Sequence, residues 1–169
     1  MRPVSRPIAA AVLACLAAGC GKPLEDGTYA FEVRSITQDS CSATPVDELL
    51  LPDARVETAG ETVQISFSAA GPLVPGLTGA SGSRALVGRY LPDDERDRFI
   101  ADATFDVVRE IGGLSCIVFS HASIAATVRD ATSFDGALRL SYTRRAEAQA
   151  ACAAGCVVEL VFEARRVGG

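Results

Sequence analysis

The chain has 169 residues, a length that fits one domain, and 49% of them are apolar, which is enough to build a core. Its 16 Lys and Arg side chains against 21 Asp and Glu give a formal net charge of -5. A nucleic-acid backbone is bound by clustered Lys and Arg side chains. This acidic chain has no basic run longer than a pair, so the composition argues against nucleic-acid binding.

Residues 1–19 have the pattern of a secretory signal peptide. Arg2 and Arg6 provide a positively charged start, and an apolar stretch follows at 8–18. That stretch is shorter than the roughly 20 residues that a membrane-spanning helix needs. We therefore predict three segments: a signal peptide (1–19), a lipidated N-terminus with a tether (20–26), and a single all-β domain (27–169).

The end of this leader, "LAAGC", resembles the lipobox of bacterial lipoproteins. In that family a small residue precedes a cysteine that is acylated on its sulfur and becomes the new N-terminus. The resemblance implies that Cys20 is lipidated and anchors the chain in a membrane. The Leu usual three places before the cysteine is Ala17 here, with Leu16 one place further out. Gly21 after the cysteine suggests, by the enteric sorting rule, the outer membrane, with the domain facing the periplasm or the cell surface.

Cys15 forms a competing lipobox, "VLAC", but its apolar stretch would be shorter. It would also leave an odd number of cysteines in an oxidising compartment. With Cys20 lipidated, four remain: Cys41, Cys116, Cys152 and Cys156. Export favours disulfides between them. The preferred pairing is Cys152–Cys156 and Cys41–Cys116; the alternatives pair Cys41 or Cys116 with the C-terminal cysteines. No metal site is predicted, because there is no C-x-x-C pair and only one histidine.

The rest of the chain alternates between apolar and polar residues. Alternation with period 2 is typical of strands with one solvated face, and such strands form antiparallel sheets. The alternating stretches are 27–33, 62–68, 99–107, 137–145 and 157–166. A less regular apolar run at 114–128 predicts one or two more central strands. Turn signals lie at Gly60, at Gly112-Gly113 and at Asp135-Gly136. The Gly-rich and Pro-rich stretch 69–83 is expected to be a loop.

Seven to nine strands in series must hide their edges in an antiparallel up-and-down barrel or a β-sandwich. Regular hairpin spacing favours the barrel. The stretch "DGTYAFEV" resembles the first strand of lipocalins, with Gly27 and Tyr29 at the positions of a Gly-x-Trp motif and Tyr in place of Trp. The resemblance implies that Arg165 or Arg166 packs over Tyr29, and that the barrel holds an apolar ligand.

No catalytic motif is evident, so the protein is predicted not to be an enzyme and to need no cofactor. His121 is expected to be structural, because no nucleophile elbow accompanies it. The sequence predicts a lipid-anchored lipoprotein of the cell envelope, with a structural or protein-interaction role. The alternative is a periplasmic β-barrel that binds an apolar small molecule or lipid. Five phenylalanines would exclude a ligand if all of them fill the interior, whereas small residues would leave room. The phenylalanines are Phe31, Phe67, Phe105, Phe119 and Phe162; the small residues are Ala101, Ala103 and Ala164.

Overall fold

The structure is a computed structural model that describes residues 23–40, 51–67, 78–79, 82–83, 85–92, 97–111, 113–144 and 155–168. At residues 78–79, 82–83, 107–111, 116, 118 and 144 the backbone alone is described. The predicted signal peptide, Cys20, Cys41 and Cys152 lie outside the described residues. Within these ranges, no helix has the length and apolar character needed to cross a membrane.

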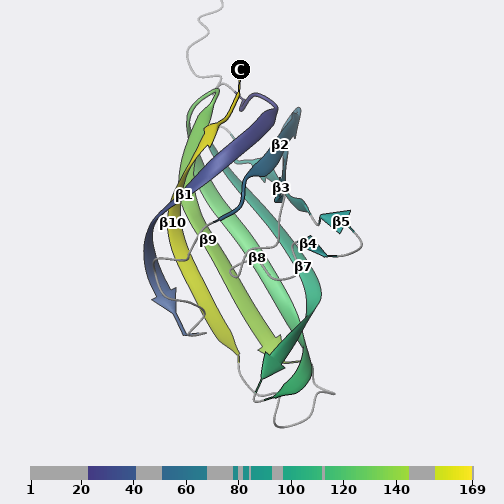
Figure 1. Ribbon diagram of the computed structural model, residues 1–169. Helices are drawn as coiled ribbons and strands as arrows, with labels where there is room; N and C mark the ends of the chain where they lie inside the picture. The colour runs from purple at the N-terminus through teal and green to yellow at the C-terminus, as the bar shows by residue number, and fades with distance from the viewer. Residues whose placement is uncertain are drawn as a thin grey trace, which may run out of the picture.

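Eight antiparallel strands form a closed up-and-down barrel, in which each strand pairs with the next one of the ring along the chain (Figure 1). The ring consists of β1 (Gly27–Asp39), β2 (Ala54–Ala59), β3 (Thr62–Phe67), β6 (Ala85–Tyr90), β7 (Arg98–Ile111), β8 (Leu114–Asp130), β9 (Ser133–Arg144) and β10 (Cys156–Arg166). This confirms the predicted barrel. Within the expected loop 69–83, β4 (Thr78–Gly79) and β5 (Gly82–Ser83) form a separate two-stranded sheet.

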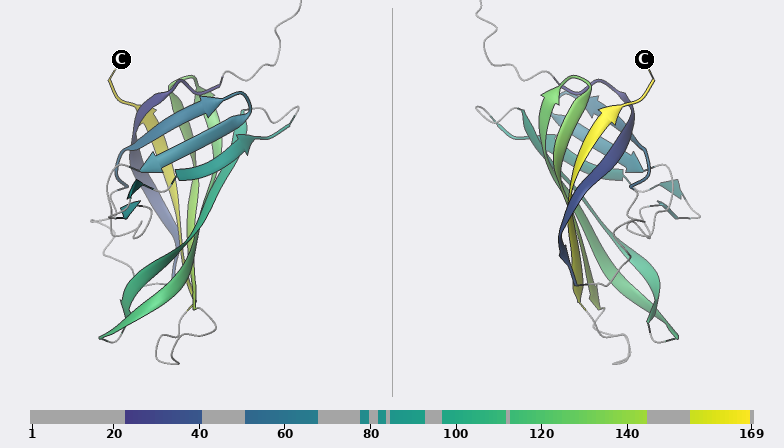
Figure 2. Two further views of the ribbon diagram at one scale, coloured as in Figure 1. Left: turned by 90° about the vertical axis from the view of Figure 1, so that its right-hand side faces the viewer. Right: turned by 60° about the vertical axis from the view of Figure 1, so that its left-hand side comes forward.

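The ring is complete at one end only, which we call the closed end. β2, β3 and β6 have six residues each, whereas β7 has 14 and β8 has 17. β1 pairs with β2 only through Gly27–Tyr29, and β6 pairs with β7 only through Phe99–Asp102. Figure 2 shows the three short strands crossing one end, while the long strands continue past them to the far end.

Burial follows the alternation in the sequence. Along β10 every second side chain from Cys156 to Ala164 is buried. The apolar run expected to form one or two strands is the single strand β8. Its even-numbered residues from Ser120 to Val128 are buried and face the interior. Its odd-numbered residues therefore lie on the outer face.

Two of the predicted turns are confirmed and one is wrong. Gly60 (φ +61°) turns the chain between β2 and β3, and Gly113 (φ +78°) lies between β7 and β8. Asp135-Gly136 lies inside β9. The turn comes earlier, where Asp130 accepts hydrogen bonds from the Thr132 backbone N–H at 2.7 Å and from the Ser133 hydroxyl at 2.6 Å. The Ser133 and Thr132 hydrogen bonds lower the pKa of Asp130 to about 2.

Two glycines that face the interior allow neighbouring strands to approach closely. A Cβ at Gly88 would lie 1.8 Å from the carbonyl oxygen of Ile100 on β7. A Cβ at Gly136 would lie 2.3 Å from the carbonyl oxygen of Ala125 on β8. Both atoms belong to the backbone and cannot move without shifting a strand. Glycine at these positions thus permits the local curvature that closes the ring.

The segment before β1 covers the closed end. Leu24 is buried, and its backbone N–H donates to the Tyr90 hydroxyl at 3.1 Å. The Glu25 N–H donates to the carbonyl of Ala131 at 2.7 Å. Asp26 accepts a hydrogen bond from the Thr58 N–H at 2.7 Å. Residues 24–26, assigned from the sequence to the tether, therefore pack on the barrel.

We expect Gly88→Ala to lower the free energy of unfolding by about 3 kcal/mol, because the added methyl must push β6 away from β7. Gly60→Asn is the matched control, since nothing lies within 4 Å of the added atom and Asn accepts a positive φ. It should change stability by less than about 1 kcal/mol. Urea unfolding followed by circular dichroism measures both variants. Equal losses would contradict the close-approach argument.

Candidate functional site

An aromatic cluster fills the closed end of the barrel, where a carrier would hold its ligand. Phe134 on β9 is its centre, with ring centroids 5.4–5.9 Å from those of Tyr29, Phe31, Phe99 and Phe162. Phe31 also contacts Phe67 and Phe162, at 5.3 and 5.0 Å. Such tilted and edge-on pairs contribute about 0.5–1.5 kcal/mol each beyond the burial of their surface. Ring carbons thus occupy the interior at this end.

Four of the five phenylalanines considered from the sequence do face inward. Phe31, Phe67, Phe105 and Phe162 are buried, at 8% exposed or less. Phe119 is 42% exposed, so an inward orientation for it is wrong. It lies on the odd-numbered, outer face of β8, opposite Asp106 of β7 and Thr143 of β9. Because the apolar run at 114–128 does not alternate clearly, the sequence alone does not show which of its residues face outward. Of the small residues, Ala101 and Ala164 are buried in the same core.

Tyr29 links the aromatic cluster to the strand ends around it. It is fully buried, and its hydroxyl donates to the carbonyl of Glu25 at 2.8 Å and lies 3.2 Å from the carbonyl of Ala131. Burial raises the pKa of Tyr29 to about 12. Tyr29 is opposite Arg166 on β10, whose side chain lies against Gly27 and pairs with Glu25 at 2.6 Å. Of the two arginines considered from the sequence, Arg166 is the one beside Gly27.

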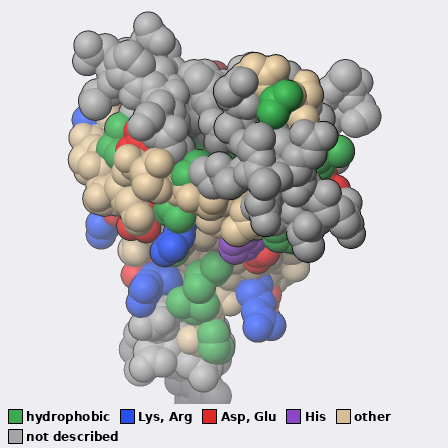
Figure 3. Space-filling model, turned by 90° about the horizontal axis from the view of Figure 1, so that it is seen from below, with side chains coloured by type: hydrophobic (Ala, Val, Ile, Leu, Met, Phe, Trp, Pro, Cys, Tyr) green, Lys and Arg blue, Asp and Glu red, His purple; other side chains and the backbone are tan. Residues whose placement is uncertain are grey.

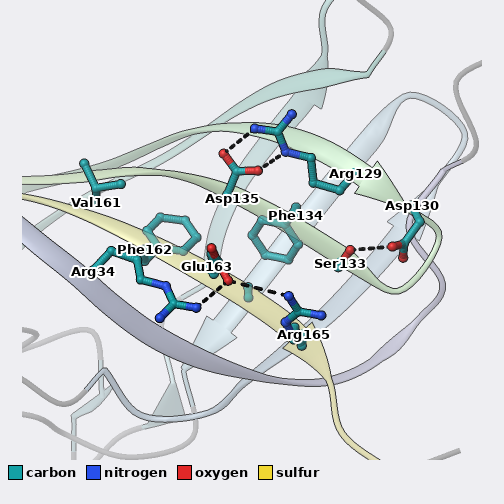
Figure 4. Close-up of a pocket in the computed structure, with 11 residues that line it drawn as sticks. Arg34, Arg129, Asp130, Ser133, Phe134, Asp135, Val161, Phe162, Glu163 and Arg165 are labelled. Atoms are coloured by element: carbon teal, nitrogen blue, oxygen red, sulfur yellow. Dashed lines mark hydrogen bonds and ion pairs between the residues drawn. The ribbon is translucent and has the colours of Figure 1, made fainter.

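A shallow cleft of about 380 Å³ lies on the outer face of β8, β9, β10 and β1 (Figure 4). Strand register places three carboxylates in one row across it, because Glu163 is opposite both Glu32 and Asp135. Three arginines interleave with this row: Arg34, Arg129 and Arg165. Sequence reasoning did not find this row, since its members are far apart in the chain and only the register brings them together.

Each carboxylate of this row has a cationic partner. Arg34 donates to Glu163 at 2.6 Å and to Glu32 at 2.5 Å. Arg129 makes a two-pronged contact with Asp135, and Arg165 lies 3.7 Å from Glu163. The Arg34 hydrogen bond lowers the pKa of Glu163. With its pKa lowered, Glu163 stays ionised near neutral pH, whereas general acid–base catalysis needs a group that titrates near the working pH. The charged side chains of the cleft therefore form a surface ion-pair network.

His121 lies on the outer face of β8, with its Nε2 atom 3.6 Å from the carboxylate of Asp102 on β7. Figure 3 shows the histidine beside acidic and hydrophobic side chains. Both side chains are substantially exposed. Ser120, a sequence neighbour considered for catalysis, faces the interior instead and is fully buried. Further along the outer face of β8, Phe119 and Ile117 are exposed.

The predicted cysteine sites are only partly visible. Cys156 is the first residue of β10; it is buried and disulfide-bonded. Cys116 lies in β8 opposite Arg109, with its backbone alone described. Cys20, Cys41 and Cys152 lie outside the described residues, so lipidation and the pairing stay predictions. Among the described residues, no group of three or more His, Cys, Asp or Glu side chains could hold a metal ion.

Comparison with known proteins gives no relative: no protein family, no curated protein and no solved structure matches this chain.

We expect Phe134→Ala to cost about 3–5 kcal/mol of unfolding free energy, because it removes the ring at the centre of the aromatic cluster and leaves a cavity. Phe119→Ala makes the same chemical change on the outer face and should cost less than about 1 kcal/mol. Urea unfolding of both variants measures the difference. If the two variants lose similar amounts, the cluster is not what stabilises the closed end.

Tyr29 should make the protein less stable in strong alkali. The unfolded chain releases the phenol proton near pH 10 and the folded chain near pH 12, so in that window the unfolded state binds fewer protons. The free energy of unfolding therefore falls as the pH rises from 10 to 12. The Tyr29→Phe variant lacks the hydrogen bond that the hydroxyl donates. At neutral pH its free energy of unfolding should therefore be about 1 kcal/mol lower. Between pH 10 and pH 12, the free energy of unfolding of this variant should fall less steeply with pH. An unchanged fall would contradict the assignment of the alkaline dependence to Tyr29.

Proposed function

We propose that this protein is a lipid-anchored lipoprotein of the cell envelope that has no catalytic role and acts through the outer surface of its barrel as a structural or protein-interaction module. The observation that carries the choice between module and carrier is the aromatic cluster. Six mutually packed rings occupy the closed end, where a small apolar ligand would have to displace them.

Chain geometry would set the orientation of an anchored barrel. Only residues 21–23 separate Cys20 from Leu24, which is buried at the closed end. An extended chain spans at most about 3.6 Å per residue, so the lipidated sulfur would hold the closed end within roughly 15 Å of the membrane. β8 has 17 residues, or about 55 Å of extended strand. The far end would therefore project away from the anchoring membrane.

Exposed apolar side chains near the far end support a role in protein contact. Ile117 is 51% exposed and Phe119 is 42% exposed, two residues apart on the same face of β8. Protein–protein interfaces commonly bury large apolar side chains of this kind. Elsewhere on the outer surface, the charged groups of the cleft are paired with one another.

Native mass spectrometry of the full-length chain, expressed with its leader and purified in mild detergent, tests both parts of the proposal. We expect a mature chain that begins at Cys20, carries lipid there and has no other bound molecule. Cys20→Ala should lose the lipid and leave the membrane fraction, whereas the matched Cys15→Ala should keep both.

Two outcomes would overturn parts of the proposal. A non-covalently bound molecule with the mass of a lipid or metabolite, released on denaturation, would establish a carrier role instead. Loss of the lipid in Cys15→Ala with its retention in Cys20→Ala would move the anchor to Cys15.

A further inference from the structure

Along most of its length, β7 has an edge with which no described strand pairs. On one side β7 pairs with β8 from end to end. On the other side it pairs with β6 only as far as Asp102. Beyond that residue β6 leaves β7, because Ala85 and Leu86 still pair with β3 but not with β7. Figure 2 shows β7 continuing past the short strands toward the far end. We call this side of Ala103–Ile111 the β7 edge.

The backbone groups of the β7 edge point away from β8. At the start of β7, the Val128 N–H donates to the carbonyl of Asp97 at 2.5 Å, so the odd-numbered residues exchange hydrogen bonds with β8. The Leu91 N–H donates to the carbonyl of Arg98 at 2.8 Å, so the even-numbered residues face β6. Past the contact with β6, the even-numbered peptide groups therefore line the β7 edge, beginning with Thr104.

The β7 edge is regular. The register of β7 against β8 runs from Arg98 to Ile111 without a shift. β1, by contrast, has two register shifts against β10. Bulges are one of the devices that keep an edge strand from pairing with another chain. A regular edge of extended backbone is the surface to which a partner adds a strand through main-chain hydrogen bonds. β7 therefore has the backbone geometry for strand addition.

The side chains of β7 specify what kind of strand would fit. Asp102, Thr104 and Asp106 are exposed on the outer face. On the inner face, Ala101 is fully buried and Phe105 is 4% exposed. An added strand continues both faces of a sheet, and opposite charges on neighbouring strands stabilise the pair. The matching strand therefore alternates basic side chains on the outer face with apolar side chains on the inner face.

We propose that the β7 edge binds an extended segment of a partner protein, which adds to β7 as a strand and places Lys or Arg side chains beside Asp102 and Asp106. The inference rests on the proposed function, because it names the kind of partner that the outer surface takes. In an anchored barrel the β7 edge lies toward the far end, away from the anchoring membrane. Ile117 and Phe119, the exposed apolar side chains of β8, lie on the same hairpin.

A second copy of the chain fits this edge less well than a basic partner. Antiparallel pairing of two β7 edges centred on Thr104 would place Asp102 of each copy opposite Asp106 of the other. Like charges directly opposite each other destabilise a strand pair. The charge on the outer face thus favours a cationic segment over a copy of β7.

Binding of a defined peptide tests the proposal. The probe is a fluorescein-labelled peptide of alternating Lys and Val, about eight residues long, which is within the usual length of a strand. Fluorescence anisotropy measures its affinity for the full-length protein in dodecyl maltoside. We expect saturable binding, and about tenfold weaker binding of the matching Glu-Val peptide, because the charge pairs with the edge change sign.

A methylated probe tests the main-chain contacts without altering the protein. Methylation of the two central backbone nitrogens of the Lys-Val peptide removes donors that strand addition uses. We expect this peptide to bind about tenfold more weakly than the unmethylated one. Equal binding of the two peptides, or no binding of the Lys-Val peptide, would overturn the proposal.

Two sets of variants locate the peptide on β7. Thr104→Pro removes a donor from the β7 edge and keeps the hydrogen bonds to β8, so binding should weaken about tenfold or more. Thr104→Ala keeps the N–H and should leave binding unchanged. Asp102→Asn/Asp106→Asn should also weaken binding about tenfold. Glu57→Gln/Glu61→Gln removes the same charge from the β2–β3 hairpin and should not. Equal losses in the two charge pairs would indicate general attraction to an acidic protein and overturn the proposal.

The same preparation separates this proposal from the proposed function. Its intact mass reports lipid at Cys20. Peptide binding at the β7 edge in a chain without lipid would contradict only the lipoprotein proposal, whereas lipid without peptide binding would contradict only strand addition. A dimer in native mass spectrometry that Thr104→Pro dissociates would assign the β7 edge to a second copy of the chain and overturn the proposal.

Discussion

The packing of aromatic rings at the closed end is the constraint on which the barrel depends. The rings come from six strands. Of the three short strands that complete the circle, β3 contributes Phe67 and β6 contributes Tyr90, whose ring centroid lies 5.8 Å from that of Phe99, whereas β2 contributes none. β1 and β7 are therefore bridged by strands of six residues that pair with them through only a few positions. Interior contacts across the barrel, such as Phe31 with Phe67, hold this thin wall in place. Gly88 and Gly136 supply the curvature, and Leu24 covers the opening.

The fold class follows from the sequence because period-2 alternation is preserved wherever one face of a strand is buried. β1, β3, β7, β9 and β10 all lie where the alternation predicts them. The alternation does not single out β2 or β6, because each has only six residues and β6 also contains Gly88. The hairpin turn predicted at Asp135-Gly136 is wrong, because these residues lie inside β9. A glycine required for close approach inside a strand has the same sequence signature as a hairpin turn, and only the neighbouring strand distinguishes the two.

The candidate sites were less accessible from the sequence, because they are built from register. Nothing local marks Glu32, Glu163 and Asp135 as one row, or places Asp102 beside His121. Phe119 shows the same limit for a single residue, since its orientation depends on the parity of β8 as a whole. What the sequence predicts without a structure is the leader, with Cys20 at its end, because that pattern is read by position along the chain alone.

β1 carries two register shifts against β10, one at Arg34 and one at Thr37. Among the described strands, none pairs with the opposite edge of β1 beyond Tyr29. A long regular edge is a template for strands of other molecules, and a bulge interrupts the even row of backbone donors and acceptors and twists the strand. Two bulges within four residues, at Arg34 and Thr37, break that template twice. At the crowding that two-dimensional confinement on a membrane would impose, this irregular edge would keep neighbouring copies from joining sheet to sheet.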